Sequence, residues 1–536
     1  RGSGGDSGAS GVGPSGGHAG VSAGTAGAPA GGRGGSGGAS AGTTGGSTIG
    51  GASSGEGSGA SAGRAGSAAS GADSAGGTSP AGGAAGDGIG GDGATAGTAA
   101  TGGAGAAGGA GATGGSSGGA ASGGSGGSGG GTPDICTFEI SDTLSADIPT
   151  VGVIDWSTDL AGMTEARIEF SLDDPEEDEL NAGSGGPISA SESRALLLGL
   201  KAGRSYTYRI VATAGETVCV SSNRSFTAGT APAPPVVTRV TGDGAASRSA
   251  GFIVTCSYSG TSAMIIDTDG DVVWWTDVPF TCSRAHMDWD GEYLWMLKAN
   301  PTFDDLGEVR RVRMDGSGAE TITGLAGSHH DFAVLPGGTT AFLVWADEDT
   351  LSSDLVERSA EGTLRTVARL DGATLGTSNN LDFHANALRY YLGDDSYTVS
   401  DLGAQGIFEL NRQGQRLWRS PMSLPGVHGH QLLANGNLLY FEAHNGNSTP
   451  LFDPSPVHEY SFSGDTETLV WSYLDEGRSV TLGDVQRLPN GNTLVTYSTD
   501  GSIHEITPAK ALVQSLEDAG QLGYSTFRET LYGPPQ

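Results

Sequence analysis

Two short phrases of sequence, each a strand followed by a turn, alternate along the second half of the chain and constrain its fold more than any other feature. One phrase occurs at 264–275, 309–318, 408–420 and 459–472, and the other at 287–297, 332–345, 430–442 and 485–498. The turn glycines of the second phrase, at 291, 338, 436 and 491, are 47, 98 and 55 residues apart, and residues 392–401 can supply the member missing from the longest gap. Alternating hairpins with a period of about 40–57 residues are typical of β-propeller blades.

Five such blades are visible between residues 264 and 500. We expect residues 236–263 and 501–532 to combine into a sixth blade, because closing the ring removes free sheet edges. The sequence therefore predicts an all-β protein in which a six-bladed β-propeller occupies residues 236–536.

The preceding region, residues 134–232, contains short runs rich in Val, Ile, Thr and aromatic residues, at 136–140, 150–157, 166–172, 206–214 and 218–227. Such runs separated by turn residues predict an antiparallel β-sandwich. The stretch LKAGRSYTYR (200–209) resembles the tyrosine corner of fibronectin type III domains, and Trp156 stands where their core Trp would. The acidic run SLDDPEEDEL (171–180) is expected to be a solvated loop, with a calcium site as the alternative.

Residues 1–133 form a low-complexity arm of Gly, Ser and Ala without any Leu, Phe, Tyr, Trp, Met or Cys, so they cannot bury a hydrophobic core. Glycine recurs with a partial period of three, as in polyproline II or polyglycine II geometry. Two interpretations stay open. The arm is either a disordered linker or a set of ordered strands through which copies of the chain self-associate.

Charge and hydropathy exclude two classes of partner. The chain has 27 Lys and Arg against 60 Asp and Glu, a net charge of −33, which repels the phosphates of nucleic acids. It contains no apolar run near the ~18 residues that a membrane span needs.

Four cysteines are present, and none forms a CxxC motif. We expect Cys136 to pair with Cys219 and Cys256 with Cys282, in an oxidising compartment, with four free thiols as the alternative. A chain that starts at Arg1 without Met is also expected to have lost an N-terminal piece such as a secretory signal. These features predict an extracellular, cell-surface or periplasmic location.

Histidines recur at matching places in three blades, in SHHDF (328–332), DFHAN (382–386) and VHGHQ (427–431). His330 and His428 each precede the turn glycine of their blade by eight residues, and His384 has a similar place in its own blade. Because inner strands line the channel of a propeller, these side chains are expected to converge on one axial pocket. The alternative is that each His is structural.

The same segments carry a family resemblance, through HHDFAVLPGG (329–338), DFHANAL (382–388), VHGHQLLANGNLLYFEAHN (427–445), GDVQRLPNGNTLV (483–495) and FRETLYGP (527–534). Over residues 250–536 the chain resembles bacterial arylsulfate sulfotransferases, which are cofactor-independent periplasmic six-bladed propellers. The resemblance implies that an aryl sulfate donates a sulfuryl group to a phenol without any cofactor.

Residue by residue, the resemblance assigns the nucleophile to His428 and the family's His-x-Asn pair to His384 and Asn386. The first pocket histidine is His330 or His329, and His430 is a further binding candidate. A neutral imidazole is a good nucleophile near pH 7. The other side chains would stabilise the sulfonyl oxygens and move the phenolic proton.

One departure from the family concerns the arginine that clamps the sulfate. The corresponding stretch, YTVSDLGAQGIFEL (397–410), has Asp401 and Leu402 in its place, and neither Arg389 nor Arg412 aligns with it. An acidic residue facing a sulfate would oppose binding.

Other functions therefore stay open. The chain is alternatively a non-catalytic filament or surface scaffold that displays the propeller head. A Zn²⁺ or Cu²⁺ site is a further alternative, although His428 and His430 both point inward only at a bulge. The last is a polysaccharide-binding propeller, suggested by Trp274, Trp275, Trp295 and Trp345, although such residues more often pack blades.

Overall fold

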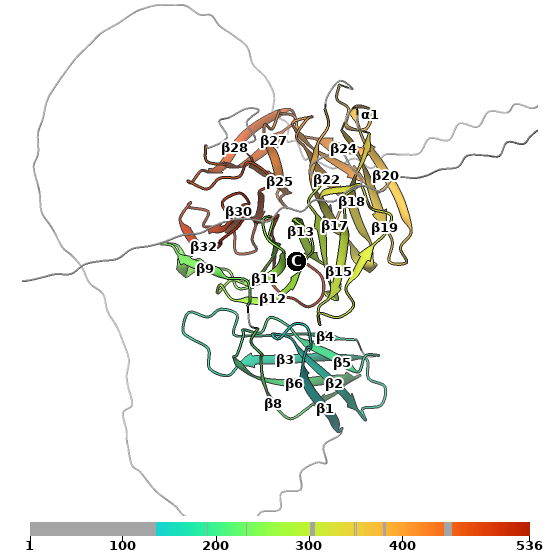
Figure 1. Cartoon of the computed structure of the whole chain (residues 1–536), viewed down its shortest axis with the longest axis vertical. Coiled ribbons are helices and arrows are strands. Elements are labelled where there is room, and N and C mark those ends of the chain that lie inside the picture. The colour runs from blue at the N-terminus through green and yellow to red at the C-terminus, as the bar shows by residue number, and fades with distance from the viewer. Residues whose placement is uncertain are drawn as a thin grey trace, which may run out of the picture. The chain divides into compact units, whose positions relative to one another are not determined.

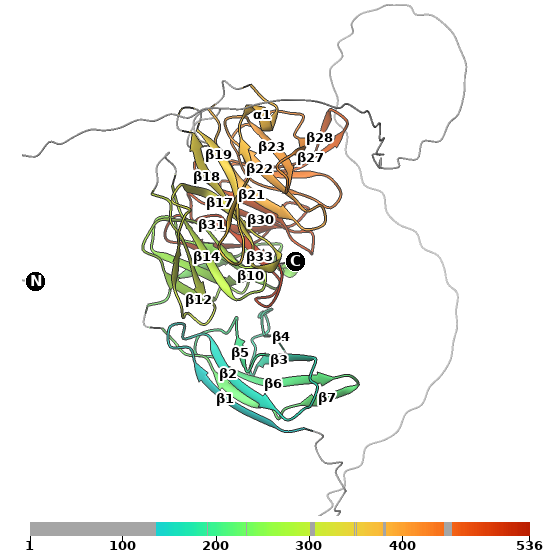
Figure 2. The same ribbon diagram turned by 90° about the vertical axis from the view of Figure 1, so that its right-hand side faces the viewer.

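The computed structural model describes residues 136–535, except 190, 232, 301–305, 348, 350, 379–381 and 444–452. The Gly-rich arm and its expected self-association therefore lie outside the described residues. Strands dominate the described part, which has one short α-helix, α1 (Gly372–Leu375), and the 3₁₀ turns η1 (Ala245–Ser247) and η2 (Pro336–Gly338). The all-β prediction is confirmed (Figures 1 and 2).

The first folded region consists of two antiparallel sheets. One contains β1 (Phe138–Leu144), β2 (Gly152–Thr158) and β5 (Arg194–Leu197) in that order. The other contains β4 (Gly183–Ile188), β3 (Glu165–Leu172), β6 (Ser205–Ala214) and β7 (Thr217–Val220), with β8 (Arg224–Thr227) also paired to β6. Alternate residues of both sheets share one core, in which Trp156 is buried against Ile168 and Phe226. The period-2 pattern that predicted these strands is the pattern of their burial.

Tyr206 anchors the turn that enters β6. Its side chain is fully buried, and its hydroxyl oxygen accepts a hydrogen bond of 2.8 Å from the backbone N–H of Lys201. This contact is a tyrosine corner, as LKAGRSYTYR predicted. The disulfide Cys136–Cys219 joins the start of the described chain to β7.

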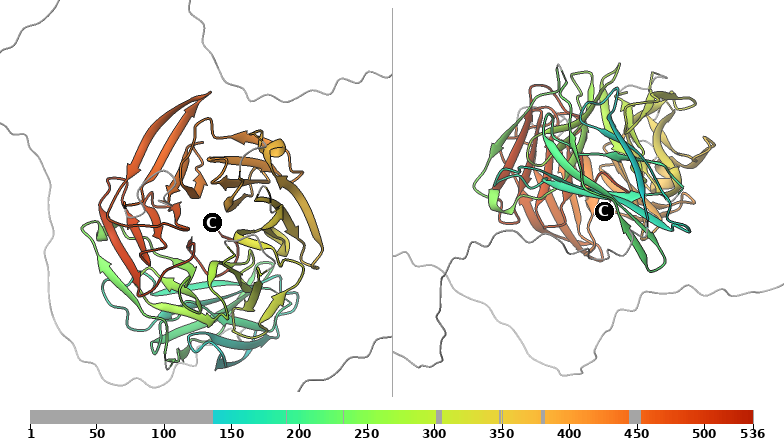
Figure 3. Two further views of the ribbon diagram at one scale, coloured as in Figure 1. Left: turned by 45° about the horizontal axis from the view of Figure 1, so that its top comes forward. Right: turned by 90° about the horizontal axis from the view of Figure 1, so that it is seen from below.

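Six antiparallel sheets follow along the chain and form the blades of a β-propeller, in a ring from green to red in the left panel of Figure 3. The first blade contains β10 (Phe252–Cys256), β11 (Ser262–Asp267) and β12 (Val272–Asp277). The second contains β13 (Cys282–Met287), β14 (Tyr293–Lys298), β15 (Val309–Arg313) and β16 (Glu320–Ile322). The third contains β17 (Ser328–Val334), β18 (Thr340–Asp347), β19 (Ser352–Arg358) and β20 (Leu364–Leu370). The fourth blade contains β21 (Ala385–Tyr391), β22 (Ser396–Asp401), β23 (Gly406–Asn411) and β24 (Arg416–Arg419). The fifth contains β25 (Val427–Leu432), β26 (Leu438–Glu442), β27 (Val457–Ser463) and β28 (Thr466–Tyr473). The sixth contains β29 (Asp484–Arg487), β30 (Thr493–Tyr497), β31 (Ser502–Ile506) and β32 (Leu512–Asp518).

The two ends of the propeller sequence close this ring, but not in the expected way. β9 (Val237–Thr241) pairs with β32 in the last blade, whereas β33 (Thr526–Arg528) pairs with β10 in the first. The two end segments therefore complete two neighbouring blades and do not combine into a separate one. Each end strand satisfies a sheet edge that would otherwise be open.

The glycines that revealed the repeat turn the hairpins of the blades. Gly291, Gly338, Gly436 and Gly491 have φ angles of 78°, 72°, 83° and 89°. This left-handed region is strained for residues with a Cβ, so glycine recurs there.

The sandwich and the propeller share a hydrophobic core. Ile148 and Leu198 of the sandwich pack with Phe252, Trp274 and Leu531 of the propeller in one buried cluster. The disulfide Cys256–Cys282 joins the first two blades. Both predicted disulfides are thus present, which indicates folding in an oxidising compartment.

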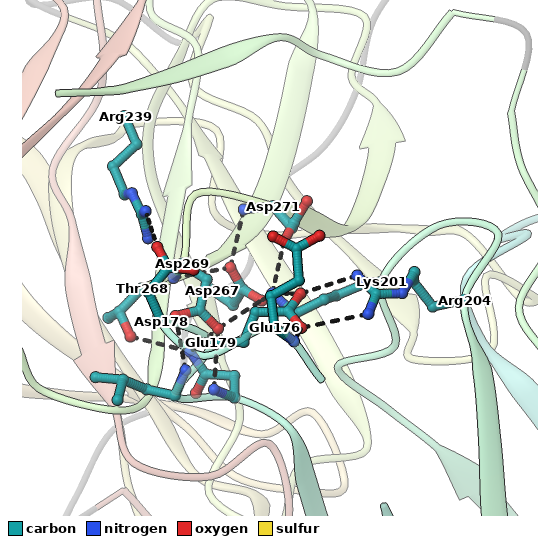
Figure 4. Close-up of polar contacts among 12 residues, drawn as sticks. Glu176, Asp178, Glu179, Lys201, Arg204, Arg239, Asp267, Thr268, Asp269 and Asp271 are labelled. Atoms are coloured by element: carbon teal, nitrogen blue, oxygen red, sulfur yellow. Dashed lines mark hydrogen bonds and ion pairs between the residues drawn. The ribbon is translucent and has the colours of Figure 1, made fainter. Parts of the chain in front are cut away.

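A buried ion cluster joins the two regions beside that core (Figure 4). Lys201 of the sandwich is 2% exposed, and its Nζ lies 2.8 Å, 3.1 Å and 2.6 Å from carboxylate oxygens of Asp267, Asp269 and Asp271. These aspartates form the β11–β12 turn of the first blade. Glu179 also lies 3.6 Å from this Nζ.

The acidic run 171–180 is exposed over residues 173–178, as expected for a solvated loop, but its end also contacts other parts of the chain. Glu179 accepts a hydrogen bond of 3.0 Å from Arg204, and Asp178 forms an ion pair of 2.7 Å with Arg239 of the propeller. The second half of this run is part of the contact between the two regions, and its cationic partners are Lys and Arg side chains.

The described residues contain no helix with the length and apolarity to cross a bilayer.

Candidate functional site

The candidate site is built by β-bulges near the start of the first strands of four blades. Pairing shifts register between Cys282 and Arg284, between Ser328 and Phe332, between Ala385 and Ala387, and between Val427 and His430. A bulge adds residues without a partner and re-aims their side chains. The histidine motifs coincide with three of these bulges, which turn their side chains toward neighbouring blades.

Three histidines from two blades form one hydrogen-bonded chain. Nδ1 of His329 lies 2.8 Å from Nδ1 of His330, and Nε2 of His330 lies 3.0 Å from Nε2 of His384. At the other end, Nε2 of His329 lies 2.9 Å from Oγ of Ser353 on β19. We refer to Ser353, His329, His330 and His384 as the imidazole chain.

The backbone at the centre of the imidazole chain is unusual. His330 has a φ of 53°, in the left-handed region that residues other than glycine seldom adopt. This conformation at the bulge allows consecutive rings of His329 and His330 to meet edge to face, with centroids 5.0 Å apart.

His428, the expected nucleophile, lies on β25 within electrostatic range of His330 and His384. Its Nδ1 lies 3.0 Å from the carbonyl oxygen of Gly426, which can only accept a hydrogen bond. Nδ1 therefore carries the proton and Nε2 keeps its lone pair. No described residue forms a hydrogen bond with Nε2.

Burial keeps these rings neutral near pH 7. It lowers the pKa of His384 and of His428 to about 4, and the pKa values of His329 and His330 also fall well below the ordinary value. The cause is the loss of water around the charged imidazolium, assisted by the neighbouring rings.

The other two predicted residues do not join the imidazole chain. Nε2 of His430 lies 2.7 Å from Oγ1 of Thr398, and burial lowers its pKa to about 3. The amide of Asn386 donates a hydrogen bond of 3.0 Å to the carbonyl oxygen of Val427, while its Oδ1 is buried without a partner. Asn386 therefore holds the fourth blade to the fifth, next to His428.

An ion network that the sequence analysis missed joins four blades. Arg284 is fully buried, and its guanidinium binds both oxygens of Asp331, at 2.6 Å and 3.0 Å, and Oδ2 of Asp484 at 2.9 Å. Arg389 binds Oδ1 of the same Asp484. Such contacts between strands distant in sequence require all four strands to lie at the centre of the ring. The one signal was that Asp331 directly follows the two histidines.

The three arginines Arg284, Arg389 and Arg412 are all bound by carboxylates. Arg284 and Arg389 are held by carboxylates, and Arg412 is bound to Glu357 at 2.8 Å. The segments within 136–535 that are not described contain no Arg or Lys.

Asp401, which stands in place of the family's arginine, is turned toward the backbone. Its carboxylate accepts hydrogen bonds from the N–H groups of His384, at 3.1 Å, and Ala404, at 2.7 Å. Burial raises its pKa to about 6, although these hydrogen bonds oppose the shift. Asp401 thus positions the His384 backbone.

An aromatic wall adjoins the imidazole chain. Trp345 stacks on His329, with centroids 3.7 Å apart and planes 11° apart, and forms a T-shaped pair with His384, with centroids 5.6 Å apart. By contrast, Trp274 and Trp295 are buried in blade cores, as residues that pack blades should be. Trp345 alone of the tryptophans singled out in the sequence touches the histidines.

A metal site finds no support in the part of the chain that the structure describes, because no three His, Cys, Asp or Glu side chains there form a group suited to an ion. His428 and His430 do flank a bulge, but each binds a different partner.

Comparison with known proteins gives distant similarity to β-propellers. No protein-family model and no curated protein matches the chain. A protein of unknown function from Bacteroides caccae is 14% identical, with a TM-score of 0.39, over 52% of this chain and 99% of its own. Virginiamycin B lyase from Staphylococcus aureus is 12% identical, with a TM-score of 0.34, over 52% of this chain and 87% of its own. AztD from Citrobacter koseri is 12% identical, with a TM-score of 0.26, over 68% of this chain and 98% of its own.

Proposed function

We propose that the histidines at the centre of the propeller transfer a sulfuryl group from an aryl sulfate to a phenol, with His428 as the nucleophile. One observation carries the proposal. The Gly426 carbonyl keeps the proton of His428 on Nδ1, so Nε2 keeps its lone pair in a ring that interacts electrostatically with His330 and His384. The resemblance of the His motifs to arylsulfate sulfotransferases selects the sulfuryl group among the groups that a histidine can carry.

In the first half-reaction, Nε2 of His428 attacks sulfur and the bond from sulfur to the aryl oxygen breaks. The phenolate leaves, and the sulfuryl group stays on Nε2 while Nδ1 keeps its proton and its bond to Gly426. In the second half-reaction, the oxygen of a phenol attacks sulfur and the S–N bond breaks, which restores neutral His428. A stabilised phenolate is a good leaving group, so no nucleotide donor or cofactor is needed.

The rest of the cluster has distinct tasks in this proposal. His384 is placed by Asp401 to exchange a proton with the phenolic oxygen. Asn386 secures the backbone that precedes His428. Trp345 supplies an apolar face against which an aryl ring can stack.

The remaining features fit a secreted or cell-surface protein. The strand orders β1-β2-β5 and β4-β3-β6-β7, together with the Tyr206 corner, support a fibronectin type III-like sandwich. The disulfides support an extracellular or periplasmic location.

A second candidate is a non-catalytic surface scaffold. It is favoured by one observation, namely that Arg284 and Arg389 are already bound to carboxylates and Arg412 to Glu357, so that none of these three is free to clamp a sulfate. In this case the histidines would only connect the blades.

Incubation with 4-nitrophenyl sulfate and a phenol separates the candidates. We expect release of 4-nitrophenol that depends on the acceptor phenol, and a protein mass that includes a sulfuryl group when the acceptor is omitted. His428→Ala should abolish both signals, whereas His504→Ala, a matched loss of histidine in the last blade, should not. Absence of nitrophenol release by the intact protein would leave the scaffold role.

A further inference from the structure

The imidazole chain has a property that no single histidine has. Each neutral imidazole carries one N–H and one lone pair. The ring contacts of His384, His330 and His329 therefore all point the same way in either of two directions, and Ser353 can donate or accept at the end. Reversing the chain moves a proton from one end to the other without any ring leaving its place.

The same contacts suit the chain to hold one extra proton. A proton that arrives at the free ring nitrogen of His384 can be passed through His330 to His329. When it rests on His329, Nε2–H donates to Oγ of Ser353 at 2.9 Å. The positive charge is thereby shared among three rings, and hydrogen bonds to charged groups are stronger than those between neutral groups.

The charged groups around the imidazole chain determine when it binds this proton. Among the described residues, the titratable groups around the chain are His428, Asp401 and Asp331. Asp401 is engaged by backbone N–H groups and Asp331 by Arg284, so neither carboxylate is free to neutralise an imidazolium. Burial keeps the imidazole chain neutral near pH 7, whereas an anion bound beside His384 would favour its protonated form.

We propose that the imidazole chain is a proton store, which takes up one proton together with an anionic sulfate ester and returns it to the departing phenolate. The proposal rests on the sulfuryl transfer proposed above and assigns new positioning roles to His329 and Ser353. The stored proton also supplies positive charge to a site where Arg284 and Arg389 are already bound to carboxylates.

The proton balance closes over one cycle. The charged chain faces the sulfate ester, His428 takes the sulfuryl group, and the phenolate oxygen receives the proton of His384, which leaves the chain neutral. The acceptor phenol then attacks sulfur and gives its proton to His384, which restores the charged chain. His428 keeps its own Nδ1 proton throughout.

Binding of inorganic sulfate tests the store without any turnover. Calorimetric titrations at pH 6 in buffers of different ionisation enthalpy give the number of protons taken up, which we expect to be about one in the intact protein. His329→Phe keeps a ring stacked on Trp345 but removes both hydrogen bonds. It should lower proton uptake and weaken sulfate binding about 10-fold, the effect of one pKa unit.

Ser353→Ala removes a single oxygen and is the safer variant for folding. We expect it to weaken sulfate binding about 3-fold, because it deletes one hydrogen bond to the charged chain. His504→Gln, which removes a partly buried histidine outside the imidazole chain, should bind sulfate as the intact protein does.

A kinetic measurement adds a readout that a purely structural role would not change. His329→Phe should slow release of unsubstituted phenol from phenyl sulfate far more than release of 4-nitrophenol, because 4-nitrophenolate departs without a proton.

The outcomes separate the two proposals. Sulfate binding with proton uptake but no turnover of aryl sulfates would support the store and overturn the sulfotransferase. Turnover with sulfate binding, proton uptake and leaving-group dependence unchanged in both chain variants would overturn the store alone. Failure of the intact protein to take up a proton with sulfate would also overturn the store.

Discussion

Replacing Lys201 by Met should strongly destabilise the contact between the sandwich and the propeller. The ammonium is 2% exposed and touches carboxylates of Asp267, Asp269 and Asp271 within 3.1 Å. Met preserves most of the side-chain volume and removes only the charge. The variant therefore measures what the ammonium does for the surrounding carboxylates.

The loss of stability in this variant depends on which hydrogen-bond and ion-pair partners each carboxylate retains. Asp271 is half exposed and can turn to water. Asp269 keeps Arg248 at 2.7 Å and two backbone N–H groups, those of Leu180 and Asn181. Asp267 keeps only backbone N–H groups on Oδ1, so its Oδ2 becomes a buried charge without a partner. Breaking one buried ion pair in this way costs about 3–5 kcal/mol.

The cost should depend on pH. Burial already raises the pKa of Asp267, and Lys201 is the main group that opposes this shift, so the pKa rises further in the variant. A group with a raised pKa in the folded state contributes stability at low pH that is lost as pH rises through that value. We therefore expect a smaller destabilisation by Lys201→Met at pH 5 than at pH 8.

Urea unfolding followed by tryptophan fluorescence measures this difference, with Lys510→Met as the control because Lys510 is exposed. In the absence of Lys201, the three carboxylates can accept a divalent cation, so millimolar Ca²⁺ should raise the midpoint of Lys201→Met and leave the intact protein unchanged. A free energy of unfolding within about 0.5 kcal/mol of the intact protein at pH 8 would refute the reasoning, since that is the range of ordinary surface substitutions.

Two further predictions concern the centre of the propeller. Arg284→Met should cost about 3–5 kcal/mol of unfolding free energy, because Asp331 is left buried without its cation while Asp484 keeps Arg389; an unchanged urea midpoint would show that the network is not needed to close the ring. Asp401→Asn cannot ionise and keeps only one of the two oxygens that accept hydrogen bonds from the N–H groups of His384 and Ala404, and the folded-state pKa of Asp401 is raised to about 6. Its stability relative to the intact protein should therefore improve as pH rises from 5 to 8, and a constant or opposite difference in melting temperature would contradict this.

The propeller could be predicted because its signals are local. Alternating apolar residues define each strand, and each hairpin needs a left-handed residue, so glycine recurs at 291, 338, 436 and 491. The tyrosine corner and the disulfide pairs were likewise accessible, because each depends on residues whose strands were already assigned. The closure of the ring was harder, since β9 and β33 carry no repeat of their own and are selected by open sheet edges.

The candidate site could be predicted only in part from the sequence. Matching positions in the repeat singled out His330, His384 and His428, because equivalent strands approach the same axis. What the repeat could not show were the bulges, which displace the histidines from regular pairing and decide which ring nitrogens meet. Ser353 entered the site through such a contact, and no motif distinguished it from the other serines.

The sequence by itself thus determined the strands, the turns and the class of fold, since these follow from the order of apolar, polar and glycine residues along a short stretch. Only the tertiary structure decided which charges compensate one another. Lys201 lies at least 66 residues from its aspartates, and Arg284 lies 47 residues from Asp331 and 200 from Asp484. A buried charge is stable only beside its counterion, and folding alone brings these distant partners within hydrogen-bonding distance.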